Sequence, residues 1–582
     1  MKLLGRIVGF LDGRAGGGAG GRGALLLLCA CALYGALQLP FTFNTGSNFE
    51  EVAALATHAL RWEHTDAQPA PAPREGGRLI TAPTPQLPVW GYETAGGGYH
   101  PIMVDGHIGA IVYYPTRWVV AVGGLLAGRL FALLGGMALV VSVWLVSNRL
   151  FAWPAAPIAA FFVATQPLVL TLFGWTHVEE QAMVLLPVLA LFFALEHERT
   201  QARWCVPAAA IAAGLGAAGK NSAAWHLLAA LLTLAIFQRR PRVTRRQWLL
   251  AGALFALPLV PQLAYACYQG RSGAMSERWQ QITSHSLFDL RRLVFFYDIF
   301  RTNFAHAGTA LAELSQGRIP PPASDLSSLL LVATVLGAAL VVPFVRGAGL
   351  AARMYGTGLL LLFLQYIALY HNDPGQFFLP VLPWVAMAVA VVGVGLSTAA
   401  DRLGRRRAWC GRALIAAAAA ALFSLNLVEA RKLYQVLTNP TSSMFALSAQ
   451  EALVHHLIEN GVESPWVVTY SEAGVYDVLS LGRVRPRLAY PIFSESCTAS
   501  ATREAPYRPA WELVLDRMQG AHEYLVLPSN PAMLEMSPCA GGPSVRAELE
   551  SVVAARGRRL RRVAGFGPAR EPAIELFEIE PR

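Results

Sequence analysis

Residues 24–62 read ALLLLCACALYGALQLPFTFNTGSNFEEVAALATHALRW, and this stretch decides the class of fold. Its first part, residues 24–41, is an apolar run long enough to enter a bilayer, since runs of about 18 or more such residues are candidate membrane spans. The adjacent carboxylates Glu50 and Glu51 follow it closely. Apolar residues then share one helical face, at positions 49, 52, 53, 56 and 60. We therefore expect residues 48–62 to form a short amphipathic helix at the membrane surface.

The composition of the whole chain fits this beginning. Of its 582 residues 54% are hydrophobic and only 14% are charged, and the mean hydropathy is +0.41. Soluble domains usually carry about 25% charged residues, so we predict a polytopic membrane protein. Candidate spans lie at residues 24–41, 125–147, 153–173, 181–196, 204–219, 221–237, 248–268, 326–345, 354–370, 377–397 and 412–428. The predicted fold class is mainly α, with a bundle of about 11 transmembrane helices, interfacial helices in the first outer loop and a small C-terminal α/β domain.

The arginines predict the orientation of the chain. They gather near the N-terminus, in the loop at 238–247 and after residue 397, whereas Glu50, Glu51, Glu179 and Glu180 lie in loops of the other side. Because basic loops stay in the cytoplasm, we expect a multi-pass protein of the inner membrane, with a cytoplasmic N-terminus and outer acidic loops. This topology accounts for the net charge of +10, so we infer no nucleic-acid partner.

The last part of the chain has a different pattern. Beyond about residue 440, apolar runs shorten to strand length at 466–470, 524–528 and 573–579, with helical patterns between them. This alternation predicts an α/β domain at residues 440–582, following a transmembrane domain at residues 1–435. An odd number of spans would place it on the outer, periplasmic side. Cys497 and Cys539 lie in it and are candidates for a disulfide in an oxidising compartment.

The order of these elements resembles the GT-C superfamily of integral-membrane glycosyltransferases, which includes the protein O-mannosyltransferases and the aminoarabinose transferase. In that family an acidic pair follows the first span and begins an interfacial helix, as EEVAALATHAL does here. The stretch YHPIMVDGHIGAIVYYPTRWVVAVGGLLAGRLFALLGG, from Tyr99, is similar to the family's second interfacial helix and the span after it. Its matching residues are His107, Gly109, Ala110, Tyr114, Pro115, Gly124 and Arg129. HVEEQ at 177–181, GLGAAGKNSA at 214–223 and QFFLPVLPWVAMAVA at 376–390 resemble further family segments.

The resemblance implies an inverting glycosyltransferase that uses a polyprenyl-phosphate-linked sugar as donor. The acceptor is a glycan, a lipid or a protein on the outer face of the membrane. Glu50 or Glu51 would be the base that takes the proton of the attacking acceptor hydroxyl. Each carboxylate also fits a helix cap, because Ser47 with Glu50, and Asn48 with Glu51, have the spacing of a capping box. A helix needs only one such box.

Candidates for binding the donor phosphate are fewer. Lys220 is one of three lysines among 47 basic residues, and it lies at the end of an apolar run, where an ionisable side chain is costly. Its compact charge suits a phosphate, although it also fits a lysine that snorkels at a helix end. Arg129 is expected to point into the bundle and to share this role. His107, Tyr114 and His371 are further substrate-binding candidates, although the sequence around His371 is also ordinary turn chemistry.

The acidic pair Glu179 and Glu180 has two interpretations. The pair either binds a divalent cation, Mg²⁺ or Mn²⁺, together with the donor phosphate, or it only marks a turn.

Two other classes of function remain open. A transporter or flippase for a lipid-linked sugar would require polar residues at mid-span depth and structurally related halves. A non-catalytic membrane scaffold would use its outer domain to bind a partner. Charges gathered at the outer ends of helices favour the enzyme, and charges in mid-membrane favour the transporter.

Overall fold

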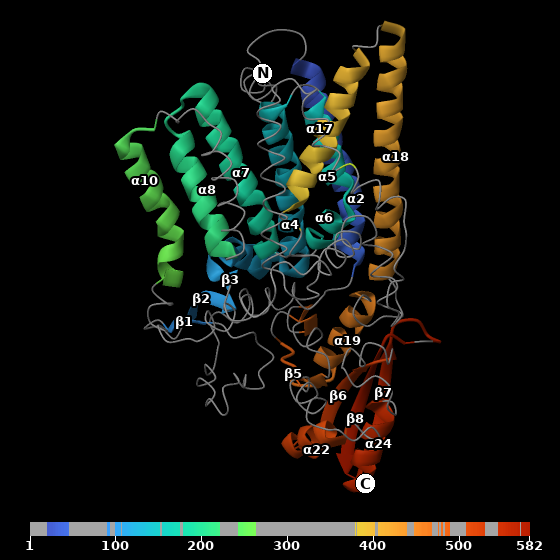
Figure 1. The fold of residues 1–582 in the computed structure, drawn as a ribbon. Helices are drawn as coiled ribbons and strands as arrows, with labels where there is room; N and C mark the ends of the chain where they lie inside the picture. Colours follow the sequence, from blue (N-terminus) through green and yellow to red (C-terminus); the bar gives the residue numbers. More distant parts are fainter. Residues whose placement is uncertain are drawn as a thin grey trace, which may run out of the picture.

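The computed structural model describes the chain in segments. They are residues 20–45, 90–93, 99–105, 108–151, 154–174, 178–220, 243–263, 334, 379, 381–401, 405–438, 447–467, 475–476, 479–480, 483–488, 508–518, 520–529, 545–570 and 572–581. Within these segments a helix bundle occupies one end of the molecule and an α/β region, residues 447–581, occupies the other (Figure 1). The predicted helix at 48–62 and the predicted spans at 221–237 and 354–370 lie outside the described residues, as does the one at 326–345 apart from Thr334.

The bundle is built from apolar helices. They are α2 (Gly20–Asn44), α4 (Tyr114–Leu150), α5 (Ala155–Thr165), α6 (Pro167–Leu172), α7 (Val178–Thr200), α8 (Cys205–Gly219), α10 (Arg245–Ala256), the short η3 (Leu257–Leu259), α17 (Leu382–Asp401) and α18 (Arg405–Leu437). Within the described segments, five helices are long and apolar enough to cross a membrane: α2, α4, α7, α17 and α18. Their buried aliphatic and aromatic side chains form one large core between α2, α4, α5, α6, α7, α17 and α18.

One predicted span is broken in the structure. Residues 153–173 were expected to form a single helix, but α5 ends at Thr165 and α6 begins at Pro167. Gln166 between them has φ −73° and ψ 120°, which is the extended conformation that a following proline favours. The break is therefore a consequence of Pro167.

The bundle has two distinguishable ends. The connections α7–α8 and α17–α18 lie at the end opposite to the α/β region (Figure 1). We call this the far end, and we call the end nearest the α/β region the sheet-side end. Arg405, from the predicted basic segment after residue 397, begins α18 at the far end. The side of the membrane on which each end lies stays a prediction.

A small sheet precedes the second span at the sheet-side end. Strands β1 (Trp90–Glu93), β2 (Tyr99–Asp105) and β3 (Ile108–Gly109) pair antiparallel, and the 3-10 turn η2 (Ala110–Tyr113) leads into α4. The stretch from Tyr99, similar to an interfacial helix in its sequence, is thus strand at residues 99–105 and 108–109. Helical structure proper begins at Tyr114.

Helix α4 is two helices joined at a corner. Gly124 has φ 61° and ψ −155°, a conformation that is essentially restricted to glycine. We call the part before this corner, residues 114–123, the interfacial helix, and the part after it is the span. Pro115 in its first turn is favourable, because a proline there removes no helical hydrogen bond.

The α/β region contains one mixed sheet. Its strands are β4 (Trp466–Val467), β5 (Arg487–Leu488), β6 (Glu523–Pro528), β7 (Arg558–Phe566) and β8 (Ile574–Pro581), in the order β5-β4-β6-β8-β7. The pairs β4–β5 and β4–β6 are parallel, and β6–β8 and β7–β8 are antiparallel. Helices α19 (Leu447–Glu459), α22 (Arg508–Arg517) and α24 (Val545–Ala555) contribute to two apolar clusters on this sheet. Cys497 and Cys539 lie outside the described residues.

Candidate functional site

Three elements meet around Lys220 at the sheet-side end of the bundle. Helix α8 contacts both η2 and β3, and α7 contacts η2. The residue before Lys220 shows how close this contact is, because a Cβ placed on Gly219 would lie 2.7 Å from Cγ1 of Val112 and 3.4 Å from Cβ of Ala182. A larger residue at 219 would separate the three elements. The first turn of α7, the last turn of α8 and η2 therefore form one junction.

The side chain of Lys220 is buried at this junction. It is only 1% exposed, and its backbone N–H donates to the carbonyl of Gly216 at 3.2 Å, which closes the last turn of α8. A cation at this position is favoured by the negative end of the helix dipole. The side chain of Gln262 donates to the carbonyl of Ala218 in the same turn. Lys220 is thus held at a helix end inside protein and does not snorkel out to bulk solvent.

Arg129 holds the end of the first span. Its guanidinium is 1% exposed, and Nη1 donates to the carbonyl oxygens of Thr45 at 2.7 Å and Thr42 at 3.2 Å. The hydroxyls of these threonines bond back to the carbonyls of Phe41 and Gln38. The last carbonyls of a helix have no partners within the helix, so Arg129 satisfies groups that burial would otherwise leave unpaired. The fixed end of α2 lies five residues before Glu50 in the sequence.

The aromatic candidates stand at the start of the interfacial helix. Tyr113 is 2% exposed and ends η2, and Tyr114, half-buried, begins the helix. Thr116, in the first turn, is also buried, and its hydroxyl has no hydrogen-bond partner in the structure. The turn η2 contacts α7 and α8 and is therefore part of the junction around Lys220. Tyr114 is the next residue after η2 in the chain.

The structure does not describe all the residues that the sequence singled out. Glu50, Glu51, His107 and His371 lie outside the described residues. Glu179 and Glu180 are described only as backbone, in the first turn of α7. The structure therefore places Lys220, Arg129, Tyr114 and the backbone of the second acidic pair at the sheet-side end of the bundle.

Sequence reasoning missed a set of buried amides. Gln38 on α2 and Gln166 between α5 and α6 are 0% exposed, and Gln181 on α7 is 5% exposed. Gln38 and Gln166 have both amide atoms without a hydrogen-bond partner in the structure, and Gln181 has its Nε2 so. Glycines leave room for two of them: a Cβ on Gly135 would lie 2.8 Å from Oε1 of Gln181, and one on Gly174 would lie 2.5 Å from Nε2 of Gln38. The sequence did contain a signal for these buried amides, namely a glutamine inside an apolar run.

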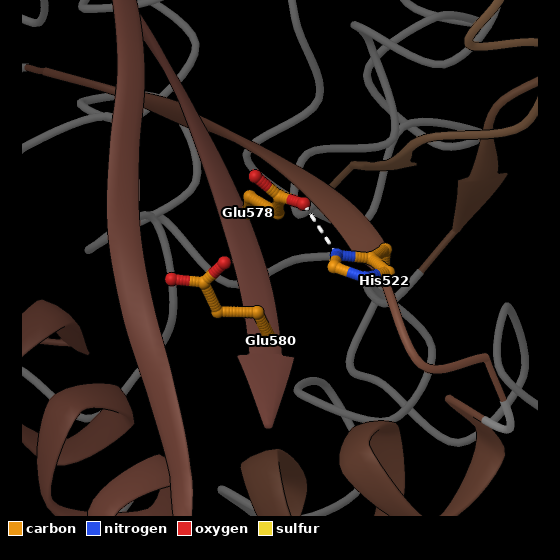
Figure 2. A group of neighbouring side chains, drawn as sticks. All are labelled: His522, Glu578 and Glu580. Carbon is orange, nitrogen blue, oxygen red and sulfur yellow. Dashed lines mark hydrogen bonds and ion pairs between the residues drawn. The ribbon is translucent and has the colours of Figure 1, made fainter. Parts of the chain in front are cut away.

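One group of metal-type ligands occurs among the described side chains, in the α/β region. His522, Glu578 and Glu580 present ligand atoms within 4.8 Å of one another (Figure 2). Nδ1 of His522 lies 2.7 Å from Oε1 of Glu578, while Arg561 pairs with the other oxygen of Glu578 and approaches Glu580 at 3.7 Å. Because the guanidinium already provides the positive charge, we interpret this group as an ion-paired clamp across β6, β7 and β8.

Comparisons with known proteins agree with the sequence resemblance. The family model described as dolichyl-phosphate-mannose-protein mannosyltransferase matches residues 116–265, which include the interfacial helix, α7 and Lys220. None of the curated proteins compared with the chain matches it. The chain thus resembles the GT-C glycosyltransferases, both in the sequence of this part and in its overall fold.

Two solved structures, both of an archaeal oligosaccharyltransferase, carry the likeness of fold. The oligosaccharyltransferase of Archaeoglobus fulgidus in complex with Zn and sulfate has a TM-score of 0.50 at 14% identity, over 90% of this chain and 70% of that one. Its apo form gives a TM-score of 0.51 at 12% identity, over 90% and 72%. ArnT from Cupriavidus metallidurans, bound to undecaprenyl phosphate, has a TM-score of 0.47 at 13% identity, over 96% and 98%.

Proposed function

We propose that this protein is a membrane glycosyltransferase that moves a sugar from a polyprenyl-phosphate carrier to an acceptor on the outer face of the inner membrane. The observation that carries the proposal is the buried Lys220 at the junction of α7, α8 and η2. A cation buried at the end of a membrane helix is costly to maintain and is a functional candidate for that reason. The acidic first turn of α7 begins at the same junction.

The reaction needs a base and a positive charge. A hydroxyl oxygen of the acceptor attacks C1 of the sugar, and Glu50 or Glu51 takes the proton of that hydroxyl. The bond between C1 and the phosphate oxygen breaks, and the polyprenyl phosphate leaves with the bonding electron pair. Because attack and departure occur on opposite faces of C1, the configuration at C1 inverts. The departing phosphate gains negative charge, which a fixed cation stabilises.

Lys220 is our candidate for that cation, and Arg129 has a second role beside it. By holding the carbonyls of Thr42 and Thr45, Arg129 fixes the end of α2. The chain reaches Glu50 five residues later, so Arg129 also sets where the carboxylates begin. His107, Tyr114 and His371 remain proposed contacts of the substrate, and Tyr114 is favoured by its place directly after η2.

A divalent cation fits the proposal without being required by it. Mg²⁺ or Mn²⁺ held by Glu179 and Glu180 would supply further positive charge at the donor phosphate. Carboxylates in the first turn of a helix are also favourable on their own, because they face the positive end of its dipole. We therefore derive the chemistry from Lys220 and the first acidic pair.

The test of the proposal combines binding with turnover. Undecaprenyl phosphate, added to the purified protein, should slow further the already slow reaction of the buried Lys220 with an amine-reactive reagent, while Lys432, which is 46% exposed, should react as before. In cells lacking the protein, one glycan or glycolipid should disappear, and its return should require Glu50 or Glu51. Glu51→Gln and Glu50→Gln keep the shape of the side chain and remove the base, so one of them should lower turnover roughly 10²-fold or more. Full activity in both variants would refute the assignment of the base.

One observation favours transport as a second candidate function. Gln38 and Gln166 are fully buried polar side chains inside the bundle, as a path for a polar substrate would require. Against this, buried charged residues that the structure describes within the candidate spans, among them Arg129, Arg149, Glu196 and Glu429, lie toward helix ends. Movement of a lipid-linked sugar across vesicles without any new glycosidic bond would support the transporter.

A further inference from the structure

The interfacial helix is in contact with the α/β region. Val120 of this helix is 0% exposed and belongs to the same apolar cluster as side chains of α19 and of strands β4, β6 and β8. Leu125, 9% exposed and the first residue of the span after the corner, also belongs to this cluster. The buried members from α19 include Ala449, Leu453, Val454 and Leu457. This cluster, which we call the docking cluster, joins a part of the bundle to residues more than three hundred positions later in the chain.

The two faces of the interfacial helix differ sharply. Trp118 is 70% exposed and Val122 is 92% exposed, whereas Val120 between them is fully buried. Residues four apart share a helical face, and a residue two positions away points to the opposite side. The helix therefore turns one face to the docking cluster and the other away from the protein, so Val120 and Val122 form a matched pair of the same residue type.

The interfacial helix is separated from the span that follows. At Gly124 the backbone leaves helical geometry, so the hydrogen-bond ladder of the span does not extend through the corner to fix the direction of residues 114–123. Contacts at the other two positions fix it instead. One is the docking cluster at Val120, and the other is η2, which directly precedes the helix.

The contact at η2 reaches the candidate site. Val112 of η2 packs against Gly219, the residue before Lys220. A shift of the interfacial helix would move Val112 and open the junction in which Lys220 is buried. The docking cluster and Lys220 are thus connected through two packed contacts and nine residues of continuous chain, from Val112 to Val120.

We propose that the α/β region positions the Lys220 site through Val120, so that Val120 is a positioning residue and the region is part of the catalytic unit. The inference rests on the proposed function only for the role of Lys220 in binding phosphate. The packing connection itself requires no substrate. It also gives the α/β region a task inside the protein, in contrast to the scaffold interpretation, in which that region only binds a partner.

The lysines of the chain provide a direct readout of this connection. The chain has three, Lys2, Lys220 and Lys432, so labelling at each can be followed separately by mass spectrometry of peptides. The full protein in detergent or nanodiscs is treated with a small amine-reactive ester, without donor. Val120→Ala and Leu453→Ala weaken the docking cluster from its two sides, and Val122→Ala is the matched control on the exposed face.

We expect Val120→Ala and Leu453→Ala to raise the labelling rate of Lys220 about tenfold or more. A factor of ten corresponds to about 1.4 kcal/mol, and truncating a buried aliphatic side chain usually costs more free energy than that. Labelling of Lys432 should not change in either variant, and Val122→Ala should behave as the parent protein. Val120→Ile should keep Lys220 protected. Since the two truncations weaken the same apolar cluster from its two sides, their combination should raise labelling by less than the product of the two single effects.

Two results would overturn the inference. One is a Lys220 labelling rate that is the same in Val120→Ala and Val122→Ala. The other is an increase at Lys432 as large as that at Lys220, which would mean general loosening of the bundle. Neither depends on a donor. Protection of Lys220 by undecaprenyl phosphate is measured separately in the parent protein, so failure of the proposed function and failure of the positioning role give different results.

Discussion

The two ends of the bundle treat buried charge in different ways. At the far end, Nε of Arg149 lies 2.7 Å from Oε2 of Glu196, and Nη2 of Arg199 lies 2.9 Å from the other oxygen of the same carboxylate. The side chains of Arg149 and Glu196 are only 4% and 5% exposed. The carboxylate of Glu196 and the two guanidinium groups neutralise one another, and the pair with Arg149 joins the end of α4 to the end of α7. A structural role is therefore enough to explain why these charges are buried.

At the sheet-side end, the buried cationic residues lie at helix ends. The guanidinium of Arg129 donates to the last carbonyls of α2, and the backbone N–H of Lys220 closes the last turn of α8. Both positions adjoin segments that carry acidic pairs in the sequence, Glu50 with Glu51 and Glu179 with Glu180. The difference teaches that burial of a charge does not by itself mark a functional site. The chemistry of its neighbourhood does, and the following predictions test that distinction.

The largest effect is expected at Lys220. Lys220→Met keeps the length and apolar stem of the side chain and removes the charge, so turnover should fall roughly 10²- to 10³-fold if the charge stabilises the departing phosphate. The melting temperature should change little, because no buried charge is added. Lys432→Met is the control, since Lys432 pairs with Glu429 at 2.7 Å and is 46% exposed. Equal turnover in both variants would remove the functional role of Lys220, and with it the proposed difference between the two ends of the bundle.

The far end should respond in stability and not in chemistry. Arg149→Met leaves the buried Glu196 paired with Arg199 alone of these two arginines. Breaking a buried pair in this way costs up to about 3–5 kcal/mol, so thermal unfolding in detergent should occur at a lower temperature. The double variant Arg149→Met with Glu196→Gln should recover part of that loss. A strong loss of turnover in correctly folded Arg149→Met would break the comparison.

The corner at Gly124 should show an effect of intermediate size. Alanine there must adopt φ 61° and ψ −155°, which L residues rarely do, at a cost of about 1–3 kcal/mol. We expect Gly124→Ala to lower the melting temperature and to make Lys220 more reactive, because the interfacial helix would change direction. Gly252→Ala is the control, since a Cβ at Gly252 meets no atom within 4 Å. Unchanged Lys220 reactivity in Gly124→Ala would separate the corner from the site.

Much of the fold followed from local patterns in the sequence. Apolar length located α2, α4, α7, α17 and α18, because crossing a membrane requires a long uninterrupted helix. The strands Glu523–Pro528 and Ile574–Pro581 lie where short apolar runs were noted. The apolar pattern predicted a single helix at residues 153–173 and did not take account of Pro167. The effect of a proline on the residue before it is local, so the break at Gln166 could have been predicted from the sequence. The strands β2 and β3 were not predicted, because the stretch that contains them resembles a helical segment of the family.

The site could be predicted only in part. Lys220 was recognisable because lysine is so rare in this chain, and Arg129 because an arginine in a span is costly on the lipid side. That Arg129 binds the end of α2 depends on contacts between residues more than eighty positions apart, which no local pattern contains. The link from Val120 to the α/β region is of the same kind. Single glutamines such as Gln38 were missed because one polar residue barely alters the hydropathy of a span.

The smallest effect is expected in the clamp around Glu578, which extends the comparison to the α/β region (Figure 2). Burial opposes ionisation of Glu578, but hydrogen bonds from His522 and Arg561 outweigh it and hold the pKa of the carboxyl below its usual value. A lowered pKa means that the clamp stabilises the folded state fully above the unfolded-state pKa, about 4.3. This contribution should be lost as the pH falls through the lower, folded-state pKa of Glu578.

Urea unfolding of the full protein, followed by proteolysis of the α/β region, should therefore show a midpoint that falls on acidification below about pH 5. Glu578→Gln should reduce this pH dependence and should weaken the region by about 1–3 kcal/mol, the usual scale for hydrogen bonds to a charged group. Glu550→Gln is the control, because Glu550 is 54% exposed and its pair with Arg546 is screened by solvent. Turnover at neutral pH should stay nearly unchanged in Glu578→Gln, since Glu578 is not a member of the docking cluster and its partners His522 and Arg561 lie within the α/β region. If Glu578→Gln instead abolished turnover while the region stayed folded, this ion-paired group would belong with Lys220 and not with the pair Arg149–Glu196.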